Sequence, residues 1–124
     1  MEASATIEPM AATSLDVQAI DRAHLAHVTF SNRSLEREVL QLFDRQAVLL
    51  LARIRTSEPR DVVGLAHTLK GSATGIGAWN VARAAEAVEV ASSRDAAECN
   101  RAVRRLVEAM DEARTAIIEL LRAA

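Results

Sequence analysis

The segment from residue 62 to residue 76 places apolar side chains at alternating intervals of four and three residues. These side chains are Val62, Ala66, Leu69, Ala73 and Ile76. At about 100° per residue, this spacing predicts a helix with one narrow apolar stripe, which is typical of a helix that packs inside a bundle. His67 falls roughly 140° from the centre of the stripe, so we expect its side chain to point into solvent.

Glycines and a lysine surround His67 on the predicted outer surface. Lys70 and Gly71 follow it by three and four residues, which places both beside it on the same face. Gly64 lies one turn earlier, and Gly75 lies one turn past Gly71. A glycine inside a helix costs about 1 kcal/mol relative to alanine, so these glycines need a reason other than stability. A surface without side chains, which lets another molecule approach the imidazole, supplies that reason.

The run His67-Thr68-Leu69-Lys70-Gly71-Ser72-Ala73, followed by Ile76-Gly77-Ala78, resembles the signature of histidine-containing phosphotransfer (HPt) domains. The wider pattern extends from about residue 25 to residue 121. The resemblance implies a four-helix bundle that carries a phosphoryl group on His67 between the aspartates of receiver domains. It also implies receiver domains and a hybrid histidine kinase as partners. It implies no cofactor held by the chain itself, and Mg²⁺ supplied by the receiver.

The resemblance suggests one more polar residue at the site. In some HPt domains a polar side chain 22 positions after the histidine reaches the ring from the adjacent helix, and here that position is Glu89. A carboxylate there would accept a hydrogen bond from the imidazole Nδ1–H, orient Nε2 outward and raise the basicity of the ring. Lys70, the only lysine beside fourteen arginines, would stabilise the phosphoryl group, and Gly71 would give the partner access.

Composition argues against several other classes of protein. The net charge of −2 argues against a nucleic-acid binder, whose affinity rests on a basic surface. No apolar run approaches the ~20 residues that span a bilayer, and the amino terminus lacks a secretory signal, so we expect a cytoplasmic protein that does not bind membranes. The single cysteine, Cys99, fits a reducing compartment and is expected to be a small buried hydrophobe.

The whole chain has the pattern of one all-α domain. A short helix is predicted from about residue 19 or 21 to residue 28, and four longer ones over residues 35–55, 57–76, 78–92 and 95–122. Short connections favour an antiparallel up-down-up-down four-helix bundle. Residues 1–14 show no periodicity and are expected to be a flexible tail, which leaves residues 15–124 as the bundle domain. We expect the protein to be a monomer.

The segment 35–55 carries more apolar residues than one seam requires. A broad inward face is predicted from Leu35, Val39, Leu42, Phe43, Leu49, Leu50 and Ile54, and it is widened by Leu40, Ala47, Val48 and Leu51. Either several neighbours touch this helix, or part of the excess stays exposed as a docking surface. The residues expected to dock a partner are Gly64, Thr74, Gly75, Leu40 and Leu51.

Two other functions stay open on the residues alone. The chain could be an α-helical adaptor that binds a receiver or a histidine kinase without carrying phosphate. It could also be a metal-binding bundle that uses His24 and His27, although no cysteine or carboxylate cluster nearby completes a site, and we expect no metal. No Walker-type nucleotide loop is present, so we expect a phosphocarrier that receives its phosphate from a partner rather than an enzyme.

Overall fold

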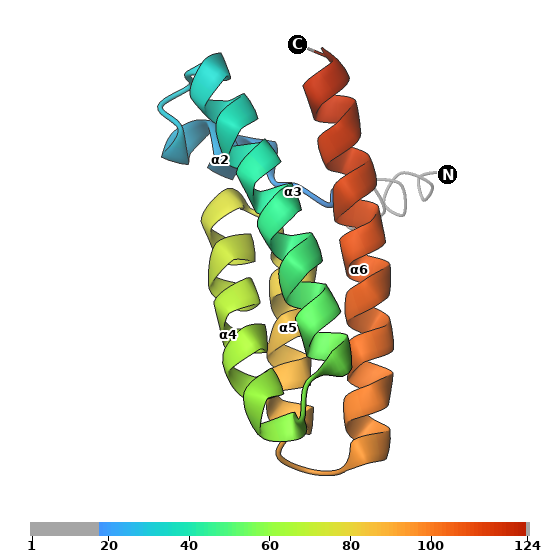
Figure 1. Ribbon diagram of the computed structural model, residues 1–124. Coiled ribbons are helices and arrows are strands. Elements are labelled where there is room, and N and C mark those ends of the chain that lie inside the picture. Colours follow the sequence, from blue (N-terminus) through green and yellow to red (C-terminus); the bar gives the residue numbers. More distant parts are fainter. Residues whose placement is uncertain (1–17, 124) are drawn as a thin grey trace, which may run out of the picture.

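The computed structural model describes residues 18–123, and within that range the regular structure is entirely helical (Figure 1). The helices are α2 (Arg22–Val28), α3 (Arg33–Thr56), α4 (Pro59–Ile76), α5 (Trp79–Ala91) and α6 (Ala96–Ala123). The predicted all-α fold is confirmed, and the predicted bounds of the four bundle helices fall within two residues of the observed ones. The predicted tail over residues 1–14 lies outside the described residues.

Helices α3 to α6 form an antiparallel bundle in which each helix has two neighbours. Helix α4 packs against α3 and α5, and α6 packs against α5 and α3. Figure 1 shows the chain direction alternating from each of these helices to the next. At a rise of about 1.5 Å per residue, α3 and α6 are about 36 and 42 Å long, and α4 and α5 about 27 and 20 Å. The upper ends of α3 and α6 therefore extend beyond their partners, and α2 lies at that end against α4.

One apolar core runs through the bundle. The stripe predicted for α4 is confirmed, since Val62, Ala66, Leu69, Ala73 and Ile76 are all buried. The facing side chains come from α5 (Val81, Ala85, Val88) and from α6 (Leu106, Met110, Ile117). The alanines on α4 and α5 leave room for the two backbones to approach closely. Among the described residues, no helix is both long enough and apolar enough to cross a membrane.

The inward face of α3 differs from the predicted one. The buried residues alternate at intervals of three and four, and they are Leu40, Phe43, Ala47, Leu50 and Ile54. Leu42 and Leu49, which were expected in this face, are 56% and 65% exposed. They lie roughly 120–140° from the centre of the buried stripe, so the helix cannot turn them inward without exposing Phe43 and Leu50.

The expectation that Leu40 and Leu51 are exposed is wrong. Leu40 is only 2% exposed and belongs to the core. Leu51 is half-buried and packs against that core. Both lie on the side of α3 that the bundle covers, so neither can form part of a docking surface. Cys99 is half-buried against the same core, and its burial raises the pKa of the thiol, which keeps it in the less reactive protonated form.

A tight turn between α4 and α5 holds α2 in place. Gly77 ends α4 with a left-handed φ of 83°, and its carbonyl accepts a hydrogen bond of 2.9 Å from the backbone N–H of Asp21. A Cβ on Gly77 would lie 3.1 Å from the Asp21 backbone oxygen, so both the φ angle and the close approach require glycine here. Trp79 Nε1–H donates to the Asp21 carboxylate at 2.9 Å, and this bond lowers the pKa of Asp21.

Candidate functional site

His67 lies near the middle of α4 on its outer side. Its side chain is 66% exposed, so the prediction that it points into solvent is confirmed. Ala66 directly precedes His67, and Leu69 is two residues after it. Both are fully buried. The backbone that carries the imidazole is therefore fixed by the core, while the ring itself is accessible.

The imidazole of His67 contacts a carboxylate from the neighbouring helix. Its Nδ1 lies 3.2 Å from Oε2 of Glu89 on α5. In the tautomer with the proton on Nδ1, the ring donates to that oxygen, and Nε2 keeps a free lone pair. The packing of α4 against α5 thus sets the orientation of the ring, because the two partners come from different helices.

Lys70 approaches the same carboxylate from the next turn of α4. Its Nζ lies 3.7 Å from Oε1 of Glu89, which is within ion-pair range but longer than a hydrogen bond. Oε1 is buried and has no hydrogen-bond partner among the residues that the structure describes. Each oxygen of Glu89 therefore faces a different side chain, the imidazole on one side and the ammonium on the other.

Three glycines form a strip along the outer side of α4, which we call the glycine strip: Gly64, Gly71 and Gly75. All three are exposed, and a Cβ built on any of them would meet no other helix or side chain of residues 18–123 within 4 Å. At about 100° per residue they lie within roughly 40° of one another around the helix. Thr74 is also exposed and lies beside the strip on the side of His67. Packing among residues 18–123 therefore does not explain these glycines.

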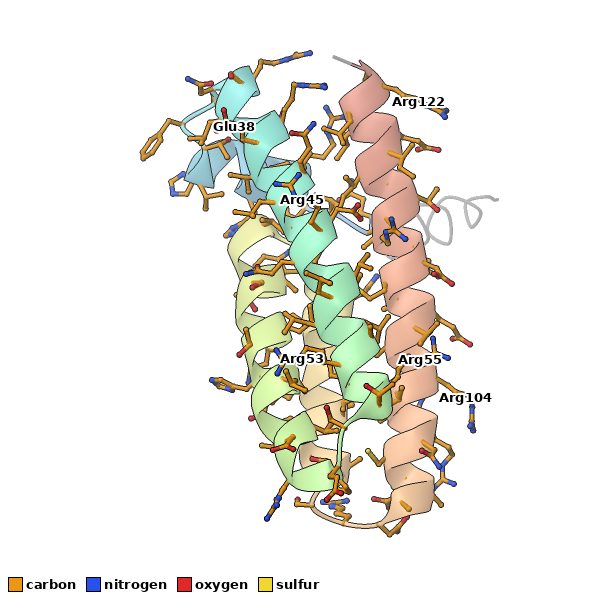
Figure 2. All side chains as sticks on the ribbon, viewed as in Figure 1. Glu38, Arg45, Arg53, Arg55, Arg104 and Arg122 are labelled. Atoms are coloured by element: carbon orange, nitrogen blue, oxygen red, sulfur yellow. The ribbon has the colours of Figure 1, made fainter. Side chains whose placement is uncertain are left out.

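The side of α3 next to the glycine strip carries two exposed leucines. Ser72 Oγ donates to Oε1 of Gln46 at 3.3 Å, which fixes the side of α3 that faces α4. Leu42 and Leu49 come four residues before Gln46 and three after it, so they lie on that same side. Both are exposed, and Arg53, labelled in Figure 2, follows four residues later in the same row.

The arrangement makes one continuous surface across three helices. Glu89 of α5 lies at one edge with His67 and Lys70, the glycine strip occupies the middle, and Leu42 and Leu49 of α3 form the far edge. The leucines were missed from the sequence because the segment offers two apolar rows, and only one of them is buried. From Leu40 to Ile54, one row has apolar residues spaced alternately by three and four residues. This regular spacing was the signal that could have identified the buried row.

The two histidines of α2 have different surroundings. His24 Nε2 lies 3.2 Å from the backbone oxygen of Gly75, and the ring packs on Trp79 with centroids 5.0 Å apart. His27 is exposed. Within residues 18–123, no three side chains of the metal-binding types come together. The role of His24 is to fasten α2 to the end of α4.

Comparison with known proteins gives one match. A family model described as Hpt domain matches residues 34–116, which takes in α3, α4, α5 and most of α6. Searches of curated proteins and of solved structures gave no match. The matched range contains the whole surface described above.

Proposed function

The chain belongs to the Hpt domain family, and on that premise we propose that His67 relays a phosphoryl group between the aspartates of receiver domains. Hpt domains are phosphocarriers of phosphorelays, where they work with receiver domains and histidine kinases. The observation that carries the proposal is the contact of 3.2 Å between His67 Nδ1 and Glu89 at an exposed imidazole. This contact leaves Nε2 as the nucleophile.

Each transfer is an in-line displacement at phosphorus. Nε2 of His67 attacks the aspartyl phosphate, the P–O bond breaks, and its electron pair remains on the aspartate carboxylate of the receiver. Glu89 holds the proton on Nδ1 and so keeps the lone pair on Nε2. The ammonium of Lys70, one turn away on a flexible stem, stabilises the phosphoryl oxygens. The receiver supplies Mg²⁺ and most of the acidic pocket, so the transfer requires no cofactor from this chain.

We place the receiver on the continuous surface of α3, α4 and α5. The glycine strip, together with Thr74, lets the aspartyl phosphate come within reach of Nε2, because no side chain larger than hydrogen stands at Gly71. Leu42 and Leu49 supply exposed apolar area beside the glycine strip, and a partner docked on this surface would bury it. Leu42 and Leu49 therefore replace Leu40, which is buried, and Leu51, which is half-buried, as the leucines proposed to contact the receiver.

The test is transfer from phosphorylated receiver domains of the same organism. The wild-type protein should gain an acid-labile, base-stable phosphate, whereas His67→Gln should gain none and keep its helical signal and melting temperature, since an exposed side chain contributes little packing. His27→Gln is the matched control, because His27 is also exposed and should leave labelling unchanged. An adaptor would bind a receiver without gaining phosphate. That result, or full labelling of His67→Gln, contradicts the proposal.

A further inference from the structure

Glu89 is placed to serve two cations at different times. Its Oε2 lies 3.2 Å from Nδ1 of His67, and its Oε1 lies 3.7 Å from Nζ of Lys70. A buried carboxylate oxygen ordinarily requires a hydrogen bond, yet Oε1 has none among the described residues. The positive charge of Lys70 stabilises Oε1 in place of a hydrogen bond. Because the two atoms are 3.7 Å apart, the ammonium is held loosely. Orientation of the ring needs Oε2 alone and does not explain this second contact.

We propose that Glu89 is an exchangeable counter-ion, paired with Lys70 before phosphoryl transfer and with the cationic ring of His67 after it. The inference rests on the proposed role of His67 and adds a positioning role for Glu89. When Nε2 gives its lone pair to phosphorus, the proton on Nδ1 stays in place, so the ring gains one positive charge. The bond from phosphorus to the leaving group breaks, and its electron pair departs with that group. No proton or electron is left unassigned.

The exchange keeps every charge of the site next to an opposite one. Before transfer the ring is neutral, and the carboxylate of Glu89 is balanced by the ammonium of Lys70. After transfer the phosphoryl dianion on Nε2 attracts that ammonium, which its four-carbon stem lets move. The carboxylate then faces the cationic ring, with which it already makes the shorter contact. Glu89 is therefore not left unpaired at either stage, although three quarters of its side chain is shielded from water.

This exchange predicts that the effect of Glu89 depends on Lys70. With Lys70 present, Glu89→Gln removes the negative charge that stabilises the ring cation, so phosphorylation slows. In a Lys70→Ala background the same carboxylate has no cation to give up, so the ring cation is its first partner and its charge stabilises the phosphorylated state by the full amount. With Lys70 present, part of that gain is offset by the loss of the pair between Glu89 and Lys70. We expect the fold-change caused by Glu89→Gln to be larger in the Lys70→Ala background by a factor of about three or more.

The experiment uses potassium phosphoramidate as donor, which delivers a phosphoryl group to histidine with loss of ammonia and needs no docking partner. Phosphorylation rates are measured for full-length wild type, Glu89→Gln, Lys70→Ala and the double variant. Glu86→Gln is the matched control, because it removes an exposed acidic charge one turn earlier on α5 and should leave the rate unchanged. Nitrogen-15 NMR of phosphorylated His67 should show Nδ1 protonated in the wild type, and less so in Glu89→Gln.

Two results would overturn the counter-ion exchange. One is an equal fold-change from Glu89→Gln in both backgrounds, as expected of a residue that only holds the ring in place. The other is a wild-type phosphorylated ring that carries no proton on Nδ1. Failure of the proposed function looks different: phosphoramidate would label His67, but no receiver domain would exchange phosphate with it, and the coupling between Glu89 and Lys70 would still be measurable.

Discussion

Alanine in place of Gly71 adds one methyl group at the centre of the glycine strip, one turn from His67. In the described part of the chain no other helix or side chain packs within 4 Å of that methyl position, so the substitution should raise the free energy of unfolding by up to about 1 kcal/mol. The same methyl group stands where the receiver must approach, so transfer should slow. Gly71→Gln should slow it further with the fold intact. Thermal melts beside a transfer assay measure both effects.

Gly77→Ala is the control for the stability effect of Gly71→Ala, because position 77 has neither the open space nor the helical φ of position 71. Its φ of 83° and the Asp21 oxygen at 3.1 Å should make alanine destabilising there. If Gly71→Ala also lowers the melting temperature, the main physical reason for placing a partner on this side of α4 is removed.

Lys70→Ala should slow transfer more than it weakens receiver binding. The ammonium acts on the transferring group, and loss of one charge-assisted contact costs about 1.5–3 kcal/mol, or roughly ten- to a hundred-fold in rate. Single-turnover transfer within the bound complex gives the rate, and calorimetric titration gives the affinity. A collapse of affinity with an unchanged rate would make Lys70 a docking residue instead.

The sequence was sufficient to predict which residues of α4 stand together. His67, Lys70 and Gly71 share one side of a single helix, and helical geometry alone fixes that relation. The distance from His67 to Glu89 could not be obtained in the same way. It depends on how closely the alanines of α4 and α5 let the two helices pack. The sequence pattern of a single helix gives no information on that spacing.

At the scale of elements, α3 shows where periodicity alone was insufficient. Its segment offers two apolar rows, one through Phe43 and Leu50 and one through Leu42 and Leu49. The bundle buries the row that matches the neighbours on α4 and α6 and leaves the other exposed. Only the positions of those neighbours decide between the rows, so the buried and exposed leucines were partly interchanged in the prediction.

The exposed row of α3 leads to a prediction about binding. Replacing Leu42 and Leu49 together with serine should weaken receiver binding about tenfold or more, because a buried leucine contributes about 1.5–3 kcal/mol. The melting temperature should change little, since both side chains are already exposed. Leu40→Ala is the opposite control and should cost about 2–5 kcal/mol of stability. Unchanged affinity in the double variant would remove α3 from the docking surface.

The contact between α2 and the bundle should weaken in acid. The hydrogen bond from Trp79, then the one from the His24 backbone N–H, lowers the pKa of Asp21. A carboxyl whose pKa is lower in the folded state stabilises the fold above its unfolded pKa, near 4, and loses that contribution as the pH falls through the folded value. The fluorescence of Trp79, the only tryptophan, should report the loss.

Asp21→Asn separates this titration from general acid unfolding. The variant cannot ionise at residue 21, so the step in Trp79 fluorescence below about pH 4 should vanish while later unfolding of the bundle remains. A step of the same size in both proteins would show that another group is responsible.

At the scale of the whole molecule, the short connections determined the topology correctly. Only residues 57–58, 77–78 and 92–95 separate the four long helices, so consecutive helices must be antiparallel neighbours. The unequal helix lengths then leave the upper ends of α3 and α6 without partners from α4 and α5, and α2 lies at that end (Figure 1). His67 is far from this end, in the part of the bundle where four helices support one another.

The glycine strip has a consequence for anyone who evolves or redesigns this bundle. Three exposed helical glycines, at about 1 kcal/mol each, represent a substantial fraction of the 5–15 kcal/mol that holds a domain folded. Alanine fits at each position without a clash, so a population selected for heat resistance alone would acquire these changes early. The survivors would be more stable and would transfer phosphate more slowly. Each round of such a selection therefore needs signalling output as a second criterion.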